Sequence, residues 1–406
     1  MSEWLSNLPV NWHIAEPRRH FRDRREVARS DDAHLTPSQH MGVLTQAEYM
    51  ERTGSRVVLN LSAPDNMKHV EPGDFIAHLR SFQGGLERSG LRGKVSTAYT
   101  VIAPDDSVHG PFYRWVLKSA AFISALSASL EQLRDGQSVK FEDFAAIPLP
   151  LPPISEQRRI ADFLDDRVAR IDQIASARQA QTVLVDEMAK AHYQGMLHRA
   201  SNGQVVEVRR LLKRAPDYGL LPDSVSDDPT GPRYVRTTDI TEEGDLREDS
   251  FVSVDPAYLA DYGLAKGDVV VARSGNTIGK ALVYRDSSAA VFAGYLVRMR
   301  FSSIDPWAFW YFTKTNGFSE QLWSNAVQST IPNFNADRYS SLAIPDVRSA
   351  NATLVESLHK VRREAAEMRL TLDRSVRLLT AYKQSLITAA VTGDLDVTTA
   401  GSGIPG

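Results

Sequence analysis

The sequence contains no cysteine, which excludes disulfides, thiolate metal sites and cysteine nucleophiles and is typical of a reducing compartment. No apolar run approaches the roughly 20 residues that a membrane span needs. Residues 1–16 lack the basic and apolar stretches of a signal peptide. We therefore expect a cytoplasmic protein without a membrane partner.

A surplus of positive charge is also absent, because the formal net charge is −3. A nucleic-acid-binding chain is often basic, so this balance counts against such a function unless local patches supply the phosphate contacts.

Catalytic motifs are missing as well. The ten histidines have no metal-ligand spacing. An adenine methyltransferase would need an Asn-Pro-Pro-aromatic loop, and Pro152-Pro153 lacks that context. Residues 275–280 superficially resemble a phosphate loop, but they are one residue short between the glycines, and Ala281 replaces the metal-binding hydroxyl. The sequence thus predicts a protein that is not an enzyme and holds no cofactor or metal of its own.

What the chain does contain is a repeat. Its 406 residues suffice for two or three domains. Three landmarks recur in the same order about 195 residues apart. These landmarks pair Pro72-Gly73-Asp74 with Lys266-Gly267-Asp268, the aromatic segment 111–117 with 306–312, and Ala146-Ile147-Pro148 with Ala343-Ile344-Pro345. Three matches in the same order and at nearly one offset are explained better by a duplicated unit than by chance similarity of short apolar segments.

Each repeat is followed by a long segment of helical composition, from about Ser155 to Arg199 and from Thr353 to Val391. The second segment carries an apolar heptad seam, which is typical of a coiled coil. The seam consists of Leu354, Leu358, Val361, Ala365, Met368, Leu372, Ser375, Leu379, Tyr382, Leu386 and Ala389. The first segment has a similar seam, formed by Ile160, Leu164, Ile171, Ile174, Val185 and Met188 and interrupted by Arg167, Arg178, Gln181 and His192.

The expected fold class is therefore α/β, of the α+β type, with two similar mixed domains and two long antiparallel coiled-coil helices in a pseudo-twofold tandem repeat. A helix of this length extends about 60–65 Å, so the pair can act as a ruler that holds the domains apart. An ordinary stabilising hairpin is the alternative. The predicted boundaries are 1–152 and 203–348 for the domains, 153–202 and 349–393 for the helices, and 394–406 for a C-terminal tail.

Two loops at matching positions of the repeat carry side chains that can hydrogen-bond to base edges. In the first repeat the candidates for DNA binding are Arg80, Ser81, Gln83, Arg88, Arg92 and Lys94. In the second repeat they are Arg273, Ser274, Asn276, Thr277 and Lys280. An ordinary polar surface turn is the competing interpretation for each of them.

Other polar residues are lesser candidates. Phosphate contacts are expected of a basic cluster formed by Arg18, Arg19, Arg22, Arg24 and Arg25, although the interleaved Asp23 and Glu26 are equally typical of a solvated surface. Asn333 and Asn335 are weaker candidates for base contacts.

Several segments together resemble a known family. They are the proline-rich stretch 147–157 ending in Glu156-Gln157, the later Ile160 and Ile171-Asp172, the C-terminal stretch 383–393, the opening Leu8-Pro9 with Trp12, and Gly267-Asp268 followed by Gly275, Ile278 and Gly279. In this order the segments resemble the specificity subunit of type I restriction–modification systems. The second repeat departs from the pattern, because Pro345-Asp346-Val347 replaces the proline-rich entry and no Glu-Gln pair follows. Whether both helices bind partners equally is therefore open.

The resemblance implies a division of labour. Each target-recognition domain would read half of a split site in double-stranded DNA. The helices would set the spacing and dock two modification subunits, which methylate adenine with S-adenosylmethionine, and restriction subunits would join for cleavage. Two alternatives remain: a coiled-coil scaffold whose end domains bind proteins, and a self-contained DNA-modifying enzyme, against which the missing catalytic loop argues.

Overall fold

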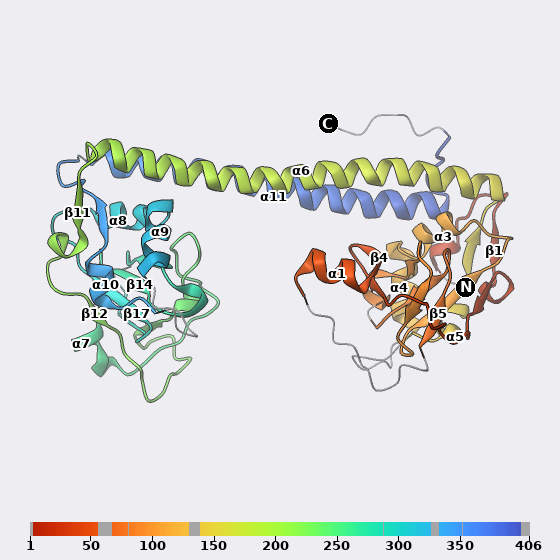
Figure 1. The fold of residues 1–406 in the computed structure, drawn as a ribbon, viewed down its shortest axis with the longest axis horizontal. Coiled ribbons are helices and arrows are strands. Elements are labelled where there is room, and N and C mark those ends of the chain that lie inside the picture. Colours follow the sequence, from red (N-terminus) through yellow and green to blue (C-terminus); the bar gives the residue numbers. More distant parts are fainter. Residues whose placement is uncertain are drawn as a thin grey trace. The chain divides into compact units, whose positions relative to one another are not determined.

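The computed structural model describes residues 3–55, 67–79, 81–129, 139–286, 288–325, 333–350 and 352–398. The chain divides into two compact units, of which the first comprises Met1–Arg178 with Arg374–Gly406 and the second Gln179–Asp373. Each unit contains one mixed domain and part of two long helices, α6 (Ile154–Ala200) and α11 (Thr353–Thr392), as Figure 1 shows.

The domain of the first unit is built on a four-stranded antiparallel sheet in the order β2-β9-β6-β7. These strands are β2 (Phe21–Asp23), β6 (Phe75–Ala77), β7 (Glu87–Arg88) and β9 (Thr100–Pro104). Three strand pairs surround the sheet: β1 (His13–Ala15) with β10 (Leu149–Leu151), β3 (Leu35–Ser38) with β4 (Gly42–Thr45), and β5 (Lys68–Val70) with β8 (Gly93–Val95). The helices of the domain are α1 (Gln46–Thr53), α2 (Ser81–Gly84), α3 (Gly110–Val116), α4 (Ala120–Ser129) and α5 (Phe141–Ala145).

The domain of the second unit has its own four-stranded antiparallel sheet in the order β12-β17-β14-β15. These strands are β12 (Asp217–Tyr218), β14 (Val269–Ala272), β15 (Ala281–Val283) and β17 (Leu296–Met299). Two pairs accompany it: β11 (Val205–Glu207) with β18 (Ala343–Pro345), and the parallel pair β13 (Arg233–Val235) with β16 (Ala290–Phe292). The helices are α7 (Leu259–Tyr262), α8 (Pro306–Phe312), α9 (Asn316–Asn325) and α10 (Ala336–Ser340).

The two domains repeat one topology, which confirms the predicted tandem fold. Strands β2, β6, β7 and β9 correspond in order and pairing to β12, β14, β15 and β17, and helices α3, α4 and α5 correspond to α8, α9 and α10. Helices α3 and α8 both carry proline in their first turn, which suits a helix start because proline lacks the amide hydrogen that would stay unpaired there. Of their aromatic side chains, Phe112, Tyr113 and Phe309 are fully buried in the core.

The Gly-Asp landmark forms the turn that precedes the central strand of each sheet. Buried Asp74 accepts the amide hydrogen of Glu71 and pairs with the guanidinium of Arg24, where Nε lies 2.6 Å from the carboxylate. In the second unit Asp268 accepts the amide hydrogen of Ala265 and pairs with Arg300 in the same way, also at 2.6 Å. The repeat therefore preserves a carboxylate that joins the turn to an arginine at the end of another strand, β2 in the first unit and β17 in the second.

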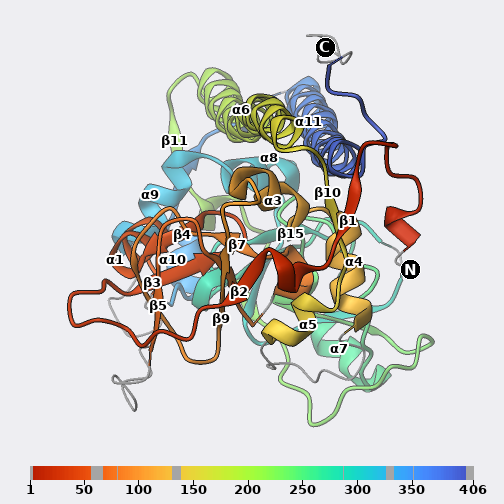
Figure 2. The ribbon, with the colours of Figure 1, turned by 90° about the vertical axis from the view of Figure 1, so that its right-hand side faces the viewer.

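The long helices run antiparallel in each unit. In the first unit, Leu164 and Ile171 of α6 pack in one core with Leu386 of α11, and Asp172 pairs with Lys383 at 2.6 Å. Figure 2 shows the two helices side by side. Among the described residues, no helix is both long enough and apolar enough to span a membrane.

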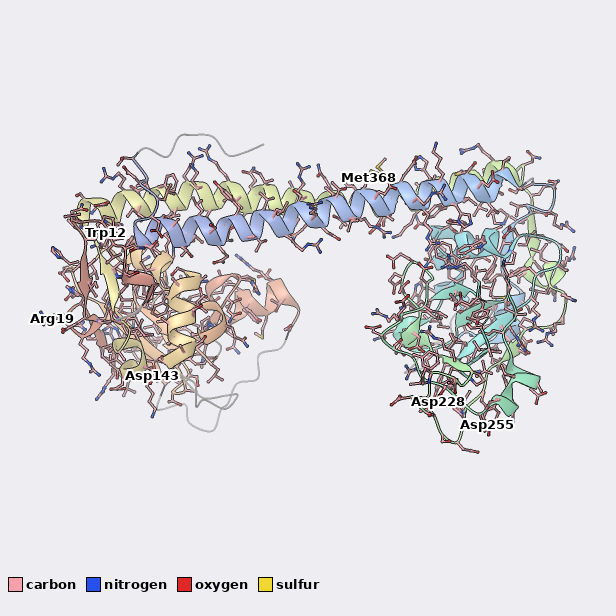
Figure 3. The ribbon with its side chains drawn as sticks, turned by 180° about the vertical axis from the view of Figure 1, so that it is seen from behind. Trp12, Arg19, Asp143, Asp228, Asp255 and Met368 are labelled. Atoms are coloured by element: carbon pink, nitrogen blue, oxygen red, sulfur yellow. The ribbon has the colours of Figure 1, made fainter. Side chains whose placement is uncertain are left out.

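In the second unit, the packing of the helices departs from part of the predicted seam. Ala189, Tyr193 and Leu197 of α6 pack in one core with Leu358 and Ala365 of α11. In contrast, the predicted seam residues Met188 and Met368 are 60% and 48% exposed, and the side chain of Met368 projects outward from its own helix, α11, in Figure 3. His192, which was taken as an interruption of the seam, lies on the exposed side of α6. A heptad pattern marks an apolar stripe, but it does not say which neighbour covers each part of that stripe.

Candidate nucleic-acid interface

The two candidate loops leave equivalent strands. One connects β6 to β7 and the other connects β14 to β15, so they occupy the same position in the two copies of the sheet. The second loop contains a short 3-10 turn, Gly275–Thr277, which begins at one glycine with positive φ, Gly275 at 70°, and is followed by another, Gly279 at 83°. Any side chain at Gly279 would come within 3.0 Å of the ring of Phe318, so this glycine allows the loop to pack closely on α9.

Arg273 follows the last residue of β14 and is held firmly. Its amide hydrogen bonds to the carbonyl oxygen of Tyr295 at 3.0 Å, and its carbonyl accepts the amide hydrogen of Phe334 at 2.8 Å. The guanidinium lies over the ring of Tyr218, 4.7 Å from the ring centre. Within the described residues, its buried Nε has no hydrogen-bond partner. Because the contact with Tyr218 uses the face of the guanidinium, its N–H groups can still donate hydrogen bonds to an acceptor outside the protein.

Residues from other segments surround Arg273. Ser274 forms an antiparallel bridge with Asn333, and Asn276 is exposed at the tip of the loop. The rings of Tyr218 and Tyr295 are 40% and 56% exposed. We call the following set the Arg273 patch: Tyr218, Arg273, Ser274, Asn276, Tyr295 and Asn333.

The sequence did not single out the two tyrosines, because the contacts that bring Tyr218 to Arg273 link strands far apart in the chain. The other asparagine considered, Asn335, caps α10 by accepting the amide hydrogen of Arg338 at 2.9 Å.

Two predicted residues of this loop make contacts within the domain. The hydroxyl of Thr277 lies 3.4 Å from the carbonyl oxygen of Ser274. The Lys280 ammonium lies 3.3 Å from the carboxylate of Glu242, and only 13% of its side chain is exposed. These contacts stabilise the loop, so Arg273 and Asn276 are its better candidates for ligand binding.

The matching loop in the first unit is described only in part. Arg80 lies outside the described residues. Ser81 is fully buried, and its hydroxyl oxygen accepts the amide hydrogen of His78 at 2.8 Å, which starts the short helix α2. Gln83 is exposed on α2 and is the predicted residue of this loop that faces solvent in the described segment.

Arg88 does not join this loop. It lies on β7 and is partly buried, with its guanidinium close to Gly110 at the start of α3. Burial, together with the nearby charge of Arg114, lowers the pKa of Arg88.

Arg92 is exposed and joins a charge network whose inner members, Asp32 and His69, are buried. Its guanidinium pairs with Asp31 at 2.8 Å and with Asp32 at 3.2 Å. Asp32 in turn contacts His69 Nδ1 at 2.6 Å, while Glu71 contacts His69 Nε2 at 2.7 Å. Burial opposes the charged form of His69, but the hydrogen bonds to Glu71 and Asp32 outweigh it and raise the pKa of the imidazole.

Lys94 lies on β8, in the strand pair with β5. The described cations among these candidates, Arg88, Arg92 and Lys94, are thus distributed over β7, β8 and the segment between them. They do not form a single described cluster like the Arg273 patch.

The start of α6 is fixed by Gln157, the second residue of the Glu-Gln pair that follows the proline-rich stretch. Gln157 is 1% exposed, and its Oε1 accepts the amide hydrogen of His109 at 2.8 Å. Its Nε2 donates to the carbonyl oxygen of Pro152 at 2.9 Å. The glutamine therefore joins the first turn of α6 both to the preceding proline segment and to α3.

A family model described as the type I restriction modification DNA specificity domain matches residues 96–181. These residues of the chain are thus similar to the DNA specificity domain of type I restriction–modification systems. The matched segment runs from β9 through α3, α4, α5 and β10 into α6, and it includes Gln157.

A curated relative agrees with this assignment. The chain is 28% identical over 107 residues to the type I restriction enzyme EcoKI specificity subunit of Escherichia coli strain K12, an alignment that covers 26% of this chain and 22% of that subunit. The homology therefore spans about a fifth of the curated relative.

Solved structures extend the likeness of fold to nearly the whole chain. One is a chain from a type I restriction–modification system, with a TM-score of 0.72, 15% identity and coverage of 96% of this chain and all of that one. Another is the HsdS subunit from Thermoanaerobacter tengcongensis, with a TM-score of 0.54, 17% identity and coverage of 97% and 100%. The chain thus shares the fold of these two structures over nearly its whole length.

A second candidate surface is an apolar groove on the helices in the second unit. It has a volume of about 770 Å³. It is lined by Gln181, Leu184, Val185 and Met188 of α6 and by Glu364, Glu367, Met368, Thr371 and Leu372 of α11. Leu184 and Met188 are each 60% exposed, which makes the groove suitable for an apolar segment of a partner.

Proposed function

We propose that this chain is the DNA-sequence-reading subunit of a type I restriction–modification complex and performs no chemistry itself. Each of its two domains, within 1–152 and 203–348, reads one half of a split, asymmetric site in double-stranded DNA. The single observation that carries the proposal is the repetition of fold. The segment 96–181 that matches a DNA specificity domain belongs to a domain whose topology recurs in the second unit, and the loops between the equivalent strands carry different side chains. Different loops at equivalent positions suit two different half-sites.

The Arg273 patch supplies the chemistry of base reading in the second domain. An arginine fork can donate two hydrogen bonds to O6 and N7 of guanine, and an asparagine can bond to N6 and N7 of adenine. Arg273 and the exposed Asn276 fit these roles. In the first domain Gln83, and Arg80 beside it in the sequence, are the proposed counterparts.

The long helices, within 153–202 and 349–393, set the spacing of the half-sites and bind the partners. Helix α6 has 47 residues, hence a length of about 70 Å, and it continues unbroken from the first unit into the second. The groove lined by Leu184, Met188 and Met368 offers an apolar docking site for a modification subunit. Two modification subunits, which use S-adenosylmethionine, and the restriction subunits carry the catalysis and the cofactors, while 394–406 is a short tail.

A coiled-coil scaffold that binds only proteins is the second candidate, favoured by the net charge of −3 and the exposed groove. A gel-shift experiment on the purified complex with its modification subunit separates the two. The DNA-reading function predicts selection of one sequence from a pool of random duplexes, and binding to it that survives competition by random DNA. Equal affinity for selected and random duplexes would favour the scaffold.

A further inference from the structure

Several arginines of the second unit form ion pairs with carboxylates inside the unit. Arg236 pairs with Asp239, Arg298 with Asp217, and Arg300 with Asp268. Such pairs occupy the guanidinium donors inside the protein. Arg273 differs, because its described contact is the face of the Tyr218 ring and no ion pair with it is found among the described residues.

Two independent contacts hold the Tyr218 ring. Tyr218 lies on β12 and pairs with Val297 of β17. The adjacent residue Asp217 forms an ion pair with Arg298, whose side chain is only 2% exposed, and this pair holds β12 in place. At the far end of the ring, the hydroxyl oxygen accepts the amide hydrogen of Ala336, the first residue of α10, at 3.1 Å. The ring is thus fixed at the backbone and at the hydroxyl.

The Arg273 backbone is also fixed, by its hydrogen bonds to Tyr295 and Phe334. With the start of the side chain and the ring both held, the guanidinium is restricted to positions over the face of the tyrosine ring. Stacking uses the face of a guanidinium and leaves its in-plane N–H groups free, whereas a carboxylate would use those groups.

We propose that Tyr218 is a positioning residue for sequence reading, which orients the Arg273 fork towards a guanine edge before DNA binds. The inference rests on the proposed function and deepens it by assigning a purine contact to the second domain. A flexible arginine would lose side-chain freedom on binding, and the preformed stack reduces that loss. The same stack disfavours the bent geometries with which an arginine could reach a neighbouring phosphate, so it favours discrimination between bases over general attraction to DNA.

The test uses the complete complex with its modification subunit and two duplexes, one with the selected site and one with the guanine of the second half-site replaced. The measured quantity is the discrimination ratio, which is the Kd for the duplex with the replaced guanine divided by the Kd for the duplex with the selected site. Tyr218→Leu removes the ring and should lower this ratio about tenfold. Tyr218→Phe keeps the stack and should leave the ratio within about twofold of the unmodified chain, although it loses the bond to Ala336. Phe251→Leu is a matched control, because Phe251 lies beneath another arginine, Arg233, at 5.7 Å; it should leave the ratio unchanged.

A double variant distinguishes positioning from general damage. If Tyr218 acts through Arg273, Tyr218→Leu should not change the ratio further in an Arg273→Ala background. A lower ratio in that background, or an unchanged ratio in the single Tyr218→Leu variant, would overturn the inference while leaving the DNA-reading function intact. If the unmodified complex itself selects no sequence, the proposed function fails instead.

Discussion

Replacing Leu184 and Met188 with glutamate tests whether the groove on α6 and α11 binds a modification subunit. Both side chains line the groove and are 60% exposed. Because they are largely solvated already and glutamate is a good helix former, the change should have little effect on the thermal unfolding of the chain itself.

The magnitude follows from the exposed area. Fully burying a leucine or methionine contributes about 1.5–3 kcal/mol, so a partner that covers the exposed part gains about 1–2 kcal/mol at each position. Losing both contributions should weaken binding about a hundredfold. The carboxylates add a further penalty, because they would have to lose water on docking.

Titration calorimetry with the purified modification subunit measures this change. Leu370→Glu is the control, because Leu370 lies on the other long helix, α11, and is similarly exposed at 65% but does not line the groove. A folded double variant that binds with unchanged Kd would refute the groove as the docking site.

Three other perturbations follow from the structure. Arg273→Ala should weaken binding to the selected site by about 1–3 kcal/mol and relax the sequence preference. Arg22→Ala, which changes an exposed residue of β2, should weaken binding to all sequences alike and lower the salt dependence of binding. If Arg273→Ala weakened binding to selected and random DNA equally, Arg273 would not read bases. At a pH below 6.5, the ordinary pKa of histidine, the charged His69 should stabilise the first unit, and this contribution should fall as the pH rises through the raised pKa. His69→Gln should abolish that part of the pH dependence of thermal unfolding. An unchanged pH profile in this variant would contradict a charged His69. Four residues inserted after Ala200 should lengthen α6 by about 6 Å and widen the gap between half-sites by one or two base pairs. If the complex still methylated DNA and the gap were unchanged, the helices would not set the distance between the half-sites.

The repeat and the long helices could be predicted from the sequence because they depend on local signals. Prolines and glycines bound the helical segments, and α6 extends over Ile154–Ala200, close to the predicted span from Ser155 to Arg199. Gly393, with φ at 80°, packs against Pro9 directly after α11, where no larger residue fits. Landmarks that recur at one offset need no knowledge of distant contacts.

The candidate site was harder to predict, because it depends on which residues meet in space. Loop position alone could not reveal that the hydroxyl of Ser81 is buried in a turn or that Lys280 faces Glu242. The stack of Arg273 on Tyr218 arises from strand pairing between segments more than fifty residues apart in the chain. The heptad pattern also gave no sign that Met188 and Met368 would be left uncovered, since a stripe that packs within the chain and one that awaits a partner look alike in sequence.

Mapping of methylated adenines across the source genome, with and without this gene, tests the central claim most directly. Two domains of one fold with different reading loops predict a single split motif whose halves differ, and methylation at that motif should disappear when the gene is deleted. A palindromic motif would contradict the assignment of different half-sites to the two domains, and a methylation pattern that does not depend on the gene would contradict the DNA-reading function itself.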